Sequence, residues 1–148
     1  MDQEAFRQTY EQLNERVCAF EKGVLSGLCG CSLADKVAIA EREGVHCRYD
    51  WAQRQCFDLL DLLRHRARFT LKLGHNTGVL PHNKAMRMQI GGVRGIFAAL
   101  HPEEEIPPCI EDIHGLLQEA LAAYGELEQL PFGEIIKQVA AFKGRQRR

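Results

Sequence analysis

The sequence has no long apolar run, and this absence limits the expected location of the protein. A membrane-spanning helix needs roughly 20 consecutive apolar residues, and no stretch of the chain approaches that length. The opening MDQEAFRQTYEQ is polar and acidic, without the apolar core of a secretory signal peptide. We therefore expect no membrane association and a cytoplasmic location, where thiols are kept reduced.

Familiar catalytic motifs are also missing. The chain has no Ser/His/Asp grouping, phosphate-binding loop, HExxH helix or dinucleotide fingerprint. These absences count against a hydrolase, a kinase and a dehydrogenase, and they favour a protein that is not an enzyme. A thiol-dependent enzyme stays open, because the six cysteines offer no way to choose a single nucleophile.

No alternation of apolar and polar residues is long enough to predict a strand. Apolar residues instead recur at steps of three and four, the period of one helical face. A chain of 148 residues has room for one domain with one core, and it needs neither disulfides nor metal merely to fold. We predict an all-α fold, a single-domain bundle of five or six helices over residues 1–148, with a Cys-rich segment at 18–56 and a frayed basic tail at 144–148. The expected helices cover residues 3–22, 33–43, 51–73, 82–100, 108–124 and 132–143.

Small residues form a second face on the helix expected over 82–100, namely Gly92, Gly95 and Ala99. A glycine inside a helix costs about 1 kcal/mol relative to alanine, so the face indicates a compensating contact. Close approach of another helix backbone is the favoured explanation, and a ligand lying against the helix is the alternative.

Charge is segregated along the chain although the net charge is only −1. Residues 62–102 carry 7 Lys/Arg and no acid, whereas residues 103–136 carry 9 acids and no Lys/Arg. Aromatic residues make up 7% of the chain, which gives little support to a base-stacking surface and makes nucleic acid an unlikely ligand. The basic block predicts either internal pairing or docking of an acidic protein partner. The residues expected to contact that partner are Arg64, Arg68, Lys72, Lys84, Arg87 and Arg94.

Five of the six cysteines fall between residues 18 and 56, and they are the candidate metal ligands: Cys18, Cys29, Cys31, Cys47 and Cys56. In the Cys-Gly-Cys turn the glycine allows both thiols to point at one place. Thiolate is the form that binds zinc, copper and iron–sulfur clusters. We expect four of the five to ligate one centre: Cys18, Cys29, Cys31 and Cys56, or a set in which Cys47 replaces Cys18.

The kind of centre is inferred from the spacing. Structural zinc modules use paired C-x₂₋₄-C knuckles, which are absent here, and the familiar iron–sulfur spacings are absent as well. Irregular spacing on helices counts more against zinc modules, because those are local turn structures. An iron–sulfur cluster for electron transfer, redox sensing or delivery to a partner is therefore preferred over structural zinc. The further alternative is a metal-free helical interaction module, whose cysteines behave as small core residues.

Overall fold

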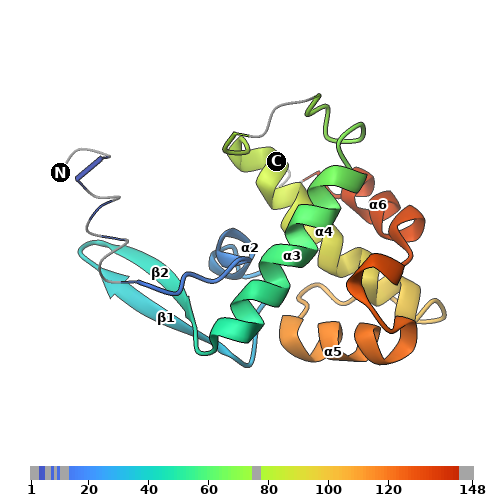
Figure 1. The fold of residues 1–148 in the computed structure, drawn as a ribbon, viewed down its shortest axis with the longest axis horizontal. Coiled ribbons are helices and arrows are strands. Elements are labelled where there is room, and N and C mark those ends of the chain that lie inside the picture. Colours follow the sequence, from blue (N-terminus) through green and yellow to red (C-terminus); the bar gives the residue numbers. More distant parts are fainter. Residues whose placement is uncertain (1–3, 6–7, 9, 11–13, 75–77, 144–148) are drawn as a thin grey trace.

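The computed structural model describes residues 4, 5, 8, 10, 14–74 and 78–143 (Figure 1). In Figure 1 a β-hairpin lies to one side of the long helix α3, α5 and α6 lie to the other, and α4 crosses α3 in this view. The named elements are, in chain order, α2 (Glu21–Leu25), β1 (Ala34–Ile39), β2 (Arg42–Cys47), α3 (Asp50–Arg66), α4 (His82–Leu100), α5 (Ile113–Tyr124), the 3₁₀ turn η1 (Leu127–Gln129) and α6 (Phe132–Ala141).

The predicted all-α fold is wrong. The segment expected to be a helix over 33–43 instead belongs to an antiparallel hairpin, formed by β1 and β2. The described part of the chain therefore combines five α-helices with one two-stranded sheet, which makes the fold mixed rather than purely helical.

The hairpin follows from its β-branched residues. Val37, Ile39 and Val45 favour the extended backbone, and Ile39 and Val45 are fully buried. The register leaves Ala40 and Glu41 as the turn. Ala40 has a φ of 56°, in the left-handed region that tight hairpin turns use. Because the turn lacks the usual Asn-Gly or Asp-Gly pair, the sequence carried no hairpin signal.

The helix predicted over 3–22 is also wrong in its second half. Residues 14–18 are not helical and run beside β2. The Cys18 N–H donates a hydrogen bond of 2.8 Å to the Val45 carbonyl oxygen. Phe20, one of the apolar residues whose spacing suggested a helix, is fully enclosed in the core. Several residues of the first half lie outside the described part of the chain.

The helices predicted in the second half of the chain are confirmed, with shifted ends. The expected α4 boundaries match the structure, whereas α3 ends at Arg66 and α5 begins only at Ile113. The predicted apolar face of α3 packs into the main core, and its buried members are Ala52, Leu59, Leu60, Leu63 and Ala67. Among the helices of the described residues, none is both long enough and apolar enough to cross a membrane.

Glycines let α4 and α6 approach each other closely. A Cβ atom at Gly95 would lie 2.6 Å from the Cα of Ile135, and one at Gly91 would lie 2.6 Å from the Cα of Val139. Gly92 faces the side chain of Leu63 instead. The expected close approach of another helix backbone is thus confirmed at Gly95.

Candidate metal centre

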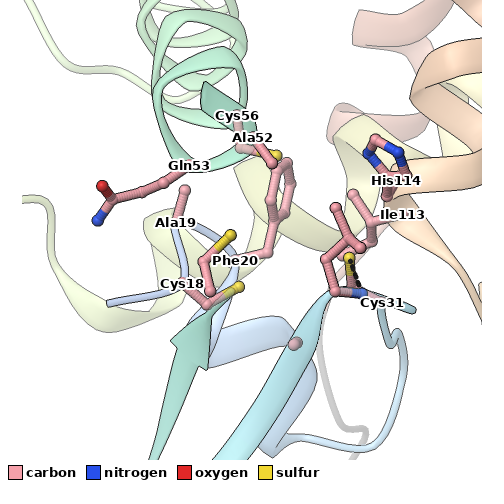
Figure 2. A pocket seen from close by; sticks show the side chains of 12 residues that line it. Cys18, Ala19, Phe20, Cys31, Ala52, Gln53, Cys56, Ile113 and His114 are labelled. Carbon is pink, nitrogen blue, oxygen red and sulfur yellow. Dashed lines mark hydrogen bonds between the residues drawn. The ribbon is translucent and has the colours of Figure 1, made fainter. Parts of the chain in front are cut away.

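Four cysteines that are widely separated in sequence line one cavity: Cys18, Cys31, Cys47 and Cys56. We call this space the thiol cavity. Its volume is about 20 Å³, which is room for about one water molecule. Figure 2 shows Cys56 on α3, Cys18 and Cys31 on the segments that precede α2 and β1, and the ring of Phe20 among them.

Backbone pairing holds Cys18 and Cys47 side by side. The Cys18 N–H donates to the Val45 carbonyl oxygen, and the Cys47 N–H donates to the Arg16 carbonyl oxygen, each at 2.8 Å. These two bonds place Cys18 on a segment that runs along β2. The pair exists only because residues 16–18 pair with β2, so a helix there would have removed it.

Helix α3 supplies Cys56 through its first two turns. Gln53 Nε2 donates to the Val17 carbonyl oxygen at 2.9 Å, which fixes the start of α3 against the extended segment. Cys56 lies one turn further along the helix, about 4.5 Å in rise from Gln53. Gln53 and Cys56 both line the thiol cavity.

The start of α5 stands beside Cys31. The Ser32 N–H donates to Asp112 Oδ1 at 2.9 Å, which ties the Cys31 turn to the residue before α5. Cys31 Sγ accepts a hydrogen bond from the Leu33 N–H at 3.5 Å. Burial raises the pKa of Cys31, and the backbone N–H groups of Leu33 and His114 partly oppose that rise because they stabilise the thiolate. Two backbone N–H groups thus support the thiolate form of Cys31, and burial outweighs them.

Two other cavity thiols, Cys18 and Cys56, are held protonated by their surroundings. Burial raises the pKa of Cys18 to about 12 and that of Cys56 to about 12. Repulsion from the neighbouring thiols, which include Cys31 and Cys47 in both cases, adds to the rise. A metal that binds here must displace these protons, so binding releases protons and strengthens as the pH rises.

The raised pKa values make the stability of the metal-free protein depend on pH. An unfolded cysteine ionises near its ordinary pKa, whereas folded Cys18 and Cys56 stay protonated up to about pH 12. The unfolded state alone therefore loses these protons above about pH 9, and the folded protein loses stability over that window. We expect a loss of about 1 kcal/mol per thiol between pH 9 and pH 10. Urea unfolding of the metal-free protein in reductant, compared with a Cys18→Ala, Cys56→Ala variant, measures it; equal pH slopes contradict the prediction.

The spacing of the thiols is wider than a single ion requires. Among the described residues, no three His, Cys, Asp or Glu side chains lie close enough together to hold one metal ion. Tetrahedral zinc has Zn–S bonds of about 2.3 Å, which places its sulfurs about 4 Å apart. The four thiols would have to move toward one another to bind zinc.

Cys29, the remaining predicted ligand, does not line the cavity. Its side chain is 3% exposed, and its Sγ lies against Gly23 of α2, where an added Cβ would be 2.7 Å away. Its backbone pairs with Ile110 in an isolated parallel bridge. The CxC turn therefore directs only Cys31 into the cavity.

Sequence reasoning missed His114, which lines the cavity from the first turn of α5. Its ring meets that of Trp51 edge-on, with 5.5 Å between centroids, and Trp51 stacks on Tyr49 at 5.8 Å. His114 is far from the cysteines in sequence and belongs to no motif, so no local signal pointed to it.

Two of the six predicted basic residues connect α4 to segments distant from the α3–α4 junction. Arg87 Nη2 donates to the Ala140 carbonyl oxygen at 3.4 Å, and Arg94 Nη1 donates to the Pro107 carbonyl oxygen at 2.9 Å. These two side chains therefore fasten α4 to neighbouring segments. The remaining four occur around the junction of α3, the following linker and the start of α4: Arg64, Arg68, Lys72 and Lys84.

Comparisons of the chain with protein-family models, with curated proteins and with solved structures found no match.

Proposed function

We infer that this chain is a small cytoplasmic metal-binding protein that carries an iron–sulfur cluster ligated by cysteine. The observation that carries the inference is the convergence of Cys18, Cys31, Cys47 and Cys56 on the thiol cavity. They come from four segments, and packing of small hydrophobic residues alone does not require four thiols at one place. All six cysteines are free, in keeping with a reducing compartment.

The wide spacing of the thiols favours a cluster over zinc, whereas the small size of the cavity does not. A zinc ion draws its four sulfurs to within about 4 Å of one another, closer than the described side chains stand. An iron–sulfur cluster is itself a body of several atoms, so its ligands stand further apart. Loading requires the thiols to rotate about a larger centre, because the cavity of about 20 Å³ holds about one water molecule.

The surroundings would tune such a cluster. The backbone N–H groups of Leu33 and His114 point at Cys31, and hydrogen bonds to ligand sulfurs are one of the factors that set the potential of iron–sulfur centres. Burial of Cys18 and Cys56 limits the access of water to that side of the centre. These features fit electron transfer, redox sensing or delivery of the cluster to a partner.

Anaerobic purification tests the proposal. We expect a coloured protein with broad visible absorption and with iron and acid-labile sulfide in stoichiometric amounts. A colourless protein with stoichiometric zinc would replace the cluster with a zinc centre. A colourless protein without metal, even after anaerobic reconstitution with iron and sulfide, would contradict the proposal and favour the metal-free interaction module.

A further inference from the structure

The chain leaves α3 toward α4 at the C-terminal end of α3 (Figure 1), whereas the residues of α3 that line the thiol cavity lie in its first two turns. The part of the chain that leaves α3 presents a basic and partly apolar surface. We call it the basic face and define it by Arg68, Phe69, Lys72, Val79 and Lys84. The 17 residues of α3 span about 25 Å, so the basic face is separate from the cavity. Binding at the basic face therefore does not depend on whether the thiol cavity holds a cluster.

Two apolar side chains of the basic face are unusually exposed. Phe69 is 80% exposed and Val79 is 95% exposed, the highest values among the large hydrophobic residues that the structure describes. The guanidinium of Arg68 lies 4.7 Å from the centroid of the Phe69 ring. Exposed apolar groups beside fixed charges are typical of surfaces that bind another protein.

Lys72 adopts a backbone conformation that its side chain disfavours. Its φ is 56°, in the left-handed region where glycine is at ease and other residues are strained. Its carbonyl oxygen accepts a hydrogen bond of 3.2 Å from Lys84 Nζ. A glycine would satisfy the same turn with less strain, so the fold alone does not explain a lysine here.

Lys84 also has an unfavourable position. It is the third residue of α4, where the helix dipole repels positive charge, and the first turn of α4 has no acidic residue to compensate. Within the described residues, neither Lys72 nor Lys84 takes part in an ion pair. Further positive charge stands nearby, because Lys22 Nζ is 3.3 Å from His82 Nδ1 at the start of the same helix.

We propose that the basic face binds an acidic protein segment, with carboxylates meeting Lys72, Lys84 and Arg68 while an apolar side chain packs on Phe69. Charge complementarity selects the partner, because residues 62–102 carry 7 Lys/Arg and no acid. A nucleic-acid surface is disfavoured because Phe69 is the only aromatic residue of the face. A lipid surface is disfavoured because a backbone carbonyl holds the Lys84 head in place, which suits a partner of fixed shape.

The test measures binding of a labelled synthetic peptide of glutamates interrupted by leucines, by fluorescence anisotropy at low and at physiological salt. We expect Lys72→Gly and Lys84→Gln each to weaken binding up to about five-fold, as loss of an exposed charge pair does. Because both changes relieve an unfavourable arrangement, the melting temperature should stay the same or rise. Phe69→Ser should weaken binding although every charge is kept.

Matched controls are Lys36→Gln and Lys137→Gln, which remove exposed lysines from β1 and α6 and should leave peptide binding unchanged. Equal affinity of the basic-face variants and the parent overturns the proposal. Tighter binding to phosphatidylserine vesicles or to duplex DNA than to the peptide overturns it as well. None of these measurements depends on whether the cysteines hold a cluster.

Discussion

Alanine at Gly95 is expected to destabilise the protein by about 1–3 kcal/mol, the range found for overpacked cores. The added Cβ would lie 2.6 Å from both the Cα and the carbonyl oxygen of Ile135. Because these are backbone atoms of α6, no side-chain rotation relieves the clash, and α4 and α6 must separate. Ile135 itself is fully buried, so separation also loosens the core. The clash outweighs the gain of about 1 kcal/mol that alanine brings inside a helix.

A matched glycine shows the opposite effect. Gly133 lies in α6, and an added Cβ there would meet no atom within 4 Å. Gly133→Ala should therefore leave stability unchanged or raise it by up to about 1 kcal/mol. Urea unfolding followed by circular dichroism measures both variants under the same conditions. A Gly95→Ala variant as stable as Gly133→Ala would show that the two helices do not meet at this point.

The sequence predicted the helices in the second half of the chain well, because the pattern of apolar and small residues within each helix is enough to indicate it. The glycines of α4 indicated a close helix contact, and Gly95 makes one. The apolar face of α3 was predicted from its period, and Leu59 and Leu63 are fully buried. Long amphipathic helices of this kind depend on local periodicity, which a single sequence displays.

The hairpin was missed because its signals are weak or ambiguous. Its strands have six residues each, short enough that apolar spacing also fits a helix. Its turn requires a left-handed backbone conformation at Ala40, and alanine gives no sequence signal for that conformation. The conformation of residues 14–18 depends on hydrogen bonds with β2. Such non-local pairing cannot be recognised from the sequence of the segment alone.

The same non-local pairing explains why the set of cysteines that line the thiol cavity was predicted only in part. The region of the candidate site and three of its four thiols were foreseen in the first set of four, which included Cys29 in place of Cys47. A helix over 33–43 would have separated Cys47 from Cys31. The observed hairpin places Cys47 at the end of the sheet where the chain passes from Cys31 into β1. Cys29 Sγ packs against Gly23 instead.

Removing any one thiol of the cavity is expected to abolish stable cluster binding. Alanine at Cys18, Cys31, Cys47 or Cys56 takes away a ligand of the cavity. Cys29 lies near Cys18 and Cys31, but its Sγ packs against Gly23 and does not line the cavity, so it is not placed to replace the lost ligand. We expect iron affinity to fall by more than about ten-fold, because even outer-shell partners of metal ligands have effects of that size. Circular dichroism of each metal-free variant controls for folding.

The two other cysteines provide internal controls. Cys29→Ala removes a buried thiol of the core, and Cys109→Ala removes a half-buried thiol ahead of α5. Neither lines the thiol cavity, so both variants should keep the iron and sulfide content of the parent. Cys29→Ala also distinguishes a loss of stability from a loss of metal ligation. It is expected to lower the free energy of unfolding through lost packing while leaving the iron content unchanged.

The most direct test of the account is the iron and acid-labile sulfide content of the six single alanine variants, purified side by side without oxygen. The account predicts iron and sulfide in the parent, in Cys29→Ala and in Cys109→Ala, and their loss in the four variants of the thiol cavity. Equal content in all six variants, or a loss confined to Cys29→Ala, would contradict a centre held by Cys18, Cys31, Cys47 and Cys56.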